Sequence, residues 1–128
     1  MPVRQHELGE AELGVLRTLW DTGPATVREV LAHLHRRGRR VAYTTVQTLL
    51  TRLEQKRYVT SDKSDLAFVY RARVSRERVT RSRLKAMVRQ LYDGAAGPLA
   101  LQLIRNERLT PKEIEELQRL IDKLAEDS

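Results

Sequence analysis

Residues 41–58 have two chemically different faces when they are read as a helix. Apolar side chains recur at helical spacing on one face, at Val46, Leu49, Leu50 and Leu53. The other face has few carboxylates and many hydroxyls, amides and guanidinium groups; its members are Thr44, Thr45, Gln47, Thr48, Thr51, Arg52 and Gln55. Such groups can enter a DNA major groove, contact phosphates and hydrogen-bond to base edges. The pattern therefore predicts an amphipathic helix and suggests its partner.

Two further helices are predicted before this segment. Helical spacing of apolar residues over 10–21 predicts the first, and the Gly-Pro pair at 23–24 ends it. Thr26-x-x-Glu29 has the spacing of a capping box and begins the second, which Gly38 ends. A helix, a short turn and a further helix form the arrangement of helix-turn-helix proteins that bind DNA.

A β-hairpin is predicted directly after the third helix. Residues 58–61 and 67–70 are rich in β-branched and aromatic side chains, and residues 62–65 separate them as a turn. The hairpin makes the expected fold mainly α with a small β wing. We therefore predict a winged helix-turn-helix DNA-binding domain over residues 1–73.

The rest of the chain reads as helical. Helical spacing of apolar residues predicts three helices, around 84–91, 99–104 and 114–124. Gly97-Pro98 is expected to break the chain between the first two, together with Gly94. Thr110-Pro111 begins the third helix, since Thr suits the N-cap and Pro suits the first helical position.

These C-terminal helices are too few and too narrow to close a core of their own. A twofold dimer would let each copy cover the other; the alternative is that the helices fold back on the N-terminal unit. We favour the dimer, because a palindromic operator needs two readers. Residues 74–128 are thus predicted to form an α-helical dimerisation domain whose apolar contacts come from Leu84, Val88, Leu91, Leu99, Leu103, Ile114, Leu117, Leu120, Ile121 and Leu124.

Charge and composition narrow the class of partner. The net charge of +7 favours nucleic acid or another anionic partner, although a generic basic surface is the alternative. Arginines at 36, 37, 39 and 40, and the basic run over 71–89, either contact phosphates or form solvated faces. The chain has no cysteine, which excludes disulfides and Cys-zinc sites. No stretch approaches the ~20 apolar residues that span a bilayer, so we expect a cytoplasmic protein without a membrane partner.

No constellation typical of catalysis is visible. There is no Ser-His-Asp order, Gly-rich phosphate loop or carboxylate pair in an apolar setting. His33 and His35 would point to different faces of a helix, and with His6 they make a poor metal site. We therefore expect no enzymatic activity, no cofactor and no metal ion.

The chain resembles the penicillinase and methicillin-resistance repressor family of bacteria along nearly its whole length. The resemblance rests on an ordered set of segments: AELGVLRTLW, GPATVREV, YTTVQTLLTRLEQKRYV, FVY, LYDG and TPKEIEEL. It implies a homodimeric winged-helix transcriptional repressor that binds a pseudo-palindromic operator in double-stranded DNA, with a link to antibiotic resistance. The family's recognition-helix positions match Thr44, Thr45, Gln47, Thr48 and Arg52.

Two residues complete the predicted DNA-binding set. Tyr43 either contacts sugar-phosphate or packs under the helix. Lys63 is the residue expected to carry the wing's contact with phosphate. Family members commonly have Gly-Arg at the tip of the wing, where this chain has Asp65-Leu66. The helix start has two interpretations, since Thr44-x-x-Gln47 has the spacing of a capping box while free amides there suit a phosphate.

The residues at the family's proteolytic cleavage position are different in this chain. A sensor-linked protease often inactivates these repressors by cutting an Asn-Phe bond in the short helix of the dimerisation arm. The corresponding pair is Gln102-Leu103, so this chain departs from the usual cleavage position of that protease partner. A related branch senses copper through a Cys-rich motif, which a chain without cysteine lacks.

Two other classes of function fit part of the sequence. A non-specific architectural or RNA-binding protein would share the basic charge without sequence preference. A protein-interaction adaptor would use only the C-terminal helices.

Overall fold

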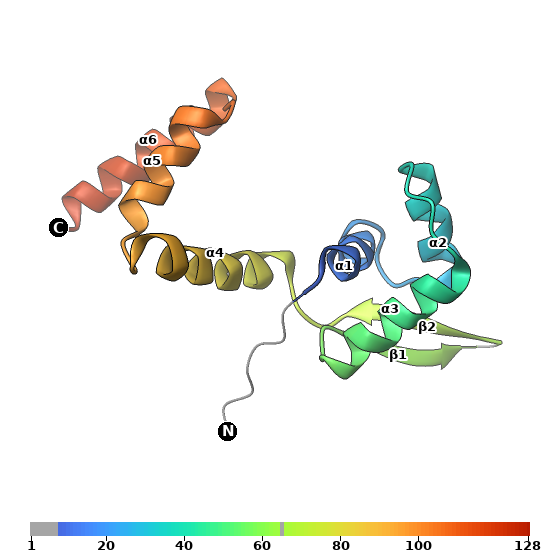
Figure 1. Cartoon of the computed structure of the whole chain (residues 1–128). Helices are drawn as coiled ribbons and strands as arrows, with labels where there is room; N and C mark the ends of the chain where they lie inside the picture. The colour runs from blue at the N-terminus through green and yellow to red at the C-terminus, as the bar shows by residue number, and fades with distance from the viewer. Residues whose placement is uncertain (1–7, 65) are drawn as a thin grey trace. The chain divides into compact units, whose positions relative to one another are not determined.

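A computed structural model describes residues 8–64 and 66–128 of the chain. Its elements are α1 (Glu10–Thr22), α2 (Val27–Arg36), α3 (Tyr43–Gln55), β1 (Val59–Ser64), β2 (Ala67–Ala72), α4 (Arg76–Tyr92), α5 (Ala96–Asn106) and α6 (Pro111–Glu126) (Figure 1). The mainly α fold with a two-stranded wing is confirmed. Among the described residues, no helix is both long and apolar enough to cross a membrane.

The chain divides into two compact units, residues 1–81 and 82–128. The first turn of α4 belongs to the first unit, where Val79 is buried in the core. The rest of α4 belongs to the second unit with α5 and α6. The roles that the sequence predicts for residues 1–73 and 74–128 stay predictions.

The first unit buries one apolar face from each of its helices. Val15 and Leu16 of α1, Val30 of α2, and Val46 and Leu50 of α3 are fully buried. Leu53 and Val59 extend this core to the end of α3 and the start of the wing. This packing fixes which side of α3 faces inward, and therefore which side faces solvent.

The starts of α2 and α6 and the end of α2 follow the predicted signals. Thr26 Oγ1 accepts from the Glu29 amide at 3.2 Å, and the Glu29 carboxylate accepts from the Thr26 amide at 2.9 Å. Thr110 and Glu113 form the same reciprocal pair at 3.1 and 2.8 Å. The predicted capping box of α2 and the predicted N-cap of α6 are confirmed. Gly38 follows α2 with a φ of +81°, a conformation that favours glycine.

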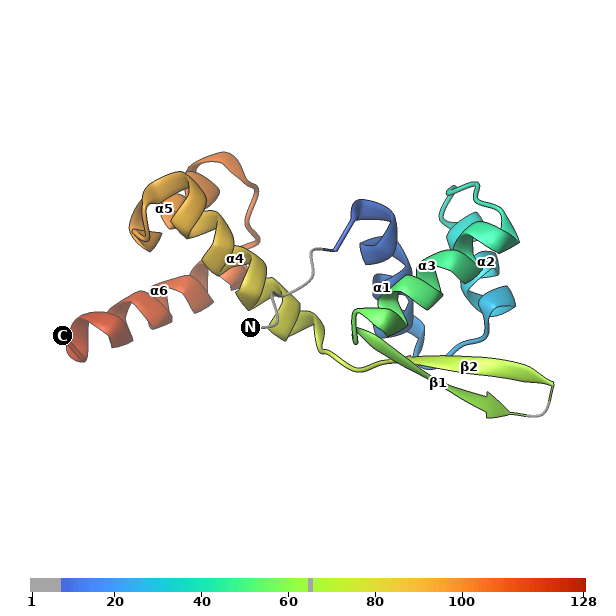
Figure 2. The ribbon, with the colours of Figure 1, turned by 60° about the horizontal axis from the view of Figure 1, so that its bottom comes forward.

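The wing is longer than the sequence predicts. The antiparallel register runs from Val59–Ala72 to Ser64–Ala67, so the predicted turn at 62–65 is wrong for 62–64, which lie in β1; Asp65 is outside the described residues. A two-stranded ribbon exposes much of its surface to solvent, so its strands can contain polar side chains. In the sequence, a run of such side chains resembles a turn. Figures 1 and 2 show the ribbon extending away from α1, α2 and α3.

A short bridge ties the base of the wing to the helices. Ala25, between α1 and α2, exchanges backbone hydrogen bonds with Tyr70 of β2, at 2.9 and 2.8 Å. The bridge adds a third short strand segment beside the hairpin, so the wing starts from a fixed position.

The second unit consists of helices without a core. None of residues 82–128 is buried. Gly94, with a φ of +94°, ends α4, but Gly97-Pro98 does not lie between helices as predicted: α5 begins at Ala96 and includes both. Pro is tolerated there because the first-turn amides of a helix have no intrahelical acceptor.

Candidate nucleic-acid interface

The polar face of α3 is exposed along its whole length. The predicted readers Thr44, Thr45, Gln47, Thr48 and Arg52 are all solvent-exposed, whereas Val46, Leu49, Leu50 and Leu53 are at most 8% exposed. The helical spacing of the apolar residues alone places these two sets on different sides. The structure thus brings the predicted recognition residues together on one surface.

The N-terminus of α3 is not capped by a side chain. Ala42 is the N-cap residue, and the helix begins at Tyr43. The predicted capping box at Thr44-x-x-Gln47 is therefore wrong, because Thr44 already lies inside the first turn. Within the described part of the chain, no side chain bonds to the first amides of α3. Uncapped amides at the positive end of the helix dipole suit a phosphate oxygen.

Most polar side chains on this face are uncommitted. Thr51 is the exception, because its hydroxyl donates to the Gln47 carbonyl at 2.9 Å. The side chains of Gln47, Thr48 and Arg52 make no hydrogen bond or ion pair with the described residues. Side chains without an internal hydrogen bond can bond to an external polar partner without breaking a hydrogen bond within the chain.

Tyr43 connects the starts of α3 and α2. Its ring is 40% exposed, and the Arg28 guanidinium carbon lies 5.6 Å from the ring centroid. The ring thus orients a cation of the first turn of α2 beside the first turn of α3. Sequence reasoning missed Arg28; its place two residues after the Thr26 cap could have pointed to it.

The wing presents a mixed surface. Lys63 Nζ lies 6.0 Å from the centroid of the Phe68 ring, on the facing strand. Arg71 is paired with Asp62 at 3.2 Å, which leaves Lys63 as the unpaired cation of the described wing. Leu66 is almost fully exposed and Phe68 is half exposed.

Two contacts hold α3 against its neighbours. Lys56, just after α3, donates to both oxygens of Glu12 on α1 at 2.7 and 2.9 Å. Burial raises the pKa of Glu12, but the hydrogen bonds from Lys56 and from the Gly9 amide outweigh it and lower the pKa overall. Ser61 of the wing donates to Glu54 of α3 at 2.8 Å. These contacts fix the polar face of α3 relative to α1 and the wing.

The start of α4 is bonded to α1. Trp20 is only partly buried; its indole donates to the Val74 carbonyl at 2.8 Å, and Arg76 lies over its ring. Arg76 also bonds to Asp21. This hydrogen bond, with the charges of Arg37 and Arg17, lowers the pKa of Asp21. The segment leading from the wing to α4 is thus held by α1.

The histidines do not gather. Among the described residues, no three His, Asp or Glu side chains are placed to hold a metal ion. His35 Nε2 lies 2.9 Å from the Val41 carbonyl, and Nε2 of His33 is buried without a hydrogen-bond partner in the described part of the chain. His6 lies outside the described residues.

Comparison with known proteins decides the family. The family model described as penicillinase repressor matches residues 8–123. The chain belongs to the penicillinase repressor family. A penicillinase repressor of Staphylococcus aureus is 27% identical over 125 residues, 98% of each chain. The transcriptional regulator BlaI of Mycobacterium tuberculosis is 34% identical over 118 residues, which are 91% of this chain and 84% of that protein.

A solved structure supports the fold. A MarR family protein from Bacillus stearothermophilus matches with a TM-score of 0.53 and 20% identity, over 95% of this chain and 76% of that one. Family membership makes this penicillinase repressor homologue a DNA-binding transcriptional repressor and not an enzyme. The family implied by the sequence segments is therefore confirmed.

Proposed function

We propose that this chain acts as a homodimer that represses transcription by binding a pseudo-palindromic operator through α3. The observation that carries the proposal is the exposed polar face of α3, where Gln47, Thr48 and Arg52 make no side-chain hydrogen bond or ion pair with the described residues. Two copies would place two such helices in successive major grooves, about one turn of DNA apart. Promoter access would then be blocked while both helices stay bound.

Each residue on this face has a role that fits its chemistry. The uncapped amides beside Thr44 and Thr45 receive a phosphate, which sets the register of the helix on the duplex. Gln47 and Thr48 face the base edges, where an amide can pair with adenine and a threonine methyl can contact thymine. Arg52, one turn further along, contacts a guanine edge or a phosphate.

Two residues flank the helix. Tyr43 carries its hydroxyl and the stacked Arg28 toward the sugar-phosphate backbone. Lys63 provides the phosphate contact of the wing.

The second copy is needed to cover residues 82–128. Large apolar side chains there are exposed in the single chain; Leu84, Leu91, Leu103, Ile114, Leu120, Ile121 and Leu124 are 42–69% exposed. Val88, Leu99 and Leu117 are half-buried in the same helices. Residues 82–128, none of which is buried, gain little from folding alone, because stability comes from apolar area removed from water. A twofold partner would supply that burial, and the ten predicted dimerisation residues would form its centre.

Release from DNA need not follow the usual route. Gln102 and Leu103 lie within α5, and the amide of Asn106 donates to both the carbonyl and the side-chain oxygen of Gln102, at 2.8 and 2.6 Å. A protease that selects Asn-Phe would meet neither residue of its preferred pair here. We therefore propose that a sensor-linked protease, if it acts on this chain, does not act at Gln102-Leu103.

A titration tests the function. The full chain is titrated against the DNA upstream of its own gene and against a scrambled duplex of the same composition, at physiological salt. A sequence-specific repressor should prefer the upstream DNA by about 10³-fold or more. Equal affinity would favour a non-specific architectural protein, and no binding to either duplex would favour an adaptor that uses only its C-terminal helices.

A further inference from the structure

A basic pocket lies in the first unit, away from the reading face of α3. It has a volume of about 240 Å³ and is lined by Gly14, Arg17, Thr18, Asp21, Leu34, Arg37 and Arg39. α1 supplies the first four of these residues, and the others come from the end of α2 and the turn that follows it. None of the α3 residues assigned to DNA lines this pocket.

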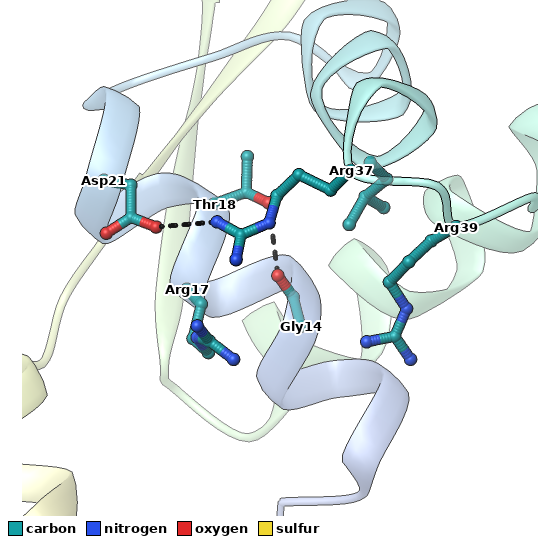
Figure 3. A pocket seen from close by; sticks show the side chains of 7 residues that line it. Gly14, Arg17, Thr18, Asp21, Arg37 and Arg39 are labelled. Atoms are coloured by element: carbon teal, nitrogen blue, oxygen red, sulfur yellow. Dashed lines mark hydrogen bonds and ion pairs between the residues drawn. The ribbon is translucent and has the colours of Figure 1, made fainter.

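Three guanidinium groups surround the pocket, against a single carboxylate. Figure 3 shows Arg17, Arg37 and Arg39 around Gly14 and Thr18, with Arg37 joined to Asp21. The floor is closed, because Thr18 is 2% and Leu34 is 5% exposed. The Thr18 hydroxyl already donates to the Gly14 carbonyl at 3.1 Å. The hydrogen-bond donors that remain available to a ligand are therefore those of the arginines.

The carboxylate in the pocket has a second partner. Asp21 Oδ2 is 3.6 Å from Arg37, a long ion pair, whereas its other oxygen is bonded to Arg76 outside the pocket. An incoming anion can therefore bind the Arg37 guanidinium while Asp21 keeps its bond to Arg76. Arg39 makes no hydrogen bond or ion pair within the described residues. Clustered guanidinium groups with spare donors are the usual receptor for phosphate and carboxylate oxygens.

Gly14 provides the space. A Cβ atom at this position would lie 3.4 Å from Nη1 of Arg39, and its other close neighbour would be the guanidinium carbon at 3.9 Å. Glycine inside a helix costs about 1 kcal/mol relative to alanine. Here it lets the Arg39 guanidinium lie close to the helix backbone, and a side chain longer than a methyl group at position 14 would displace that guanidinium or enter the pocket.

We propose that this pocket binds a small oxyanion, a phosphate group held by Arg17, Arg37 and Arg39 over Gly14. The volume suits inorganic phosphate or a small phosphorylated molecule better than a drug-sized ligand, which takes about 300 Å³ or more. The same phosphate chemistry could come from a free anion or from the DNA backbone. These two sources are separated by experiment.

The first experiment titrates the full chain with inorganic phosphate and with pyrophosphate, against sodium chloride at equal ionic strength. Arginine Nε–H resonances are followed by NMR. A saturable shift confined to Arg17, Arg37 and Arg39, with a Kd of about 1 mM or tighter, is expected. A linear drift equal to that in chloride, with no saturation, counts against a free-anion site.

Two variants make this test specific. Gly14→Leu keeps every charge but fills the pocket, and should abolish the saturable shift while α1 stays folded by circular dichroism. Arg39→Gln should weaken binding about tenfold, since it removes charge-assisted hydrogen bonds. Its matched control is Arg40→Gln, which removes the same charge from the same turn but does not line the pocket. If Arg40→Gln weakens binding as much as Arg39→Gln, the pocket is not the site.

The second experiment asks whether the phosphate belongs to DNA. It rests on the proposed operator binding, whereas the anion titration does not. If a DNA phosphate fills the pocket, Gly14→Leu should reduce the salt dependence of operator binding by about one phosphate contact. If only the free anion binds, the salt dependence stays unchanged and the NMR shift is lost. Absence of both effects overturns the proposal.

Discussion

Glu12 is the only charged side chain that is buried in the described part of the chain. Its partner Lys56 is partly exposed and follows α3, so their ion pair joins the start of α1 to the end of α3. The Gly9 amide donates to the same carboxylate at 2.8 Å. A buried carboxylate is tolerated only when its oxygens are bonded in this way.

Glu12→Gln should lower the free energy of unfolding by about 1–3 kcal/mol, because Lys56 loses a charged acceptor. The pKa of Glu12 is lowered in the folded state from its ordinary 4.5. The stability that it contributes is therefore present above pH 4.5 and is lost as the pH falls through the folded pKa. Urea unfolding at several pH values should show the gap between wild type and variant closing in acid. Glu10→Gln, an exposed change in the same turn, should leave stability within about 0.5 kcal/mol.

Arg52→Ala should weaken binding to the upstream DNA by about 1–3 kcal/mol if Arg52 reads a base, with reduced preference over scrambled DNA. If Arg52 contacts a phosphate, affinity for both duplexes should fall alike. Arg108→Ala, which removes an exposed arginine outside the predicted DNA-binding set, is the control. Unchanged affinity in a folded Arg52→Ala protein would remove Arg52 from the interface.

At the level of elements, the helices of the first unit could be predicted because their signals are local. Apolar spacing determines which side of α1, α2 and α3 is buried, and the Thr26 capping box determines where α2 begins. The strands of the wing could not be placed as well. Asp62 and Lys63 belong to β1, where a cross-strand ion pair and a ring contact replace apolar burial.

The candidate interface could be predicted from the sequence as far as the single helix that carries it, α3. The exposed face of α3 follows from the spacing of Val46, Leu50 and Leu53. The stacking of Arg28 on Tyr43, and the pocket around Gly14, depend on how separate elements meet. Such contacts need the angles between helices, which spacing within one helix does not provide.

The peptide bond between Gln102 and Leu103 should resist a sensor protease that cuts Asn-Phe. Incubation of the full chain with an activated protease of this kind should leave residues 96–106 intact by mass spectrometry. The double variant Gln102→Asn, Leu103→Phe restores the pair of the family and should be cut. Cleavage of the wild-type chain at this bond would refute the prediction.

At the scale of the whole molecule, the proposed dimer depends on the exposed apolar side chains of residues 82–128. If the proposed dimer forms, Leu120→Asp should convert it into monomers by sedimentation, because a carboxylate would be buried between two copies. Operator affinity should fall sharply in parallel. Gln118→Asp adds the same charge on nearly the opposite side of α6 and should leave the dimer intact. A Leu120→Asp protein that remains dimeric would exclude this face from the interface.

Hydroxyl-radical footprinting of the full chain on its upstream DNA tests most directly whether a dimer reads a pseudo-palindromic operator. Two α3 helices related by a twofold axis should protect two regions, about 10 base pairs apart or a multiple of that distance, arranged symmetrically about one centre. A single unsymmetrical region, or uniform protection without preferred positions, would contradict the account.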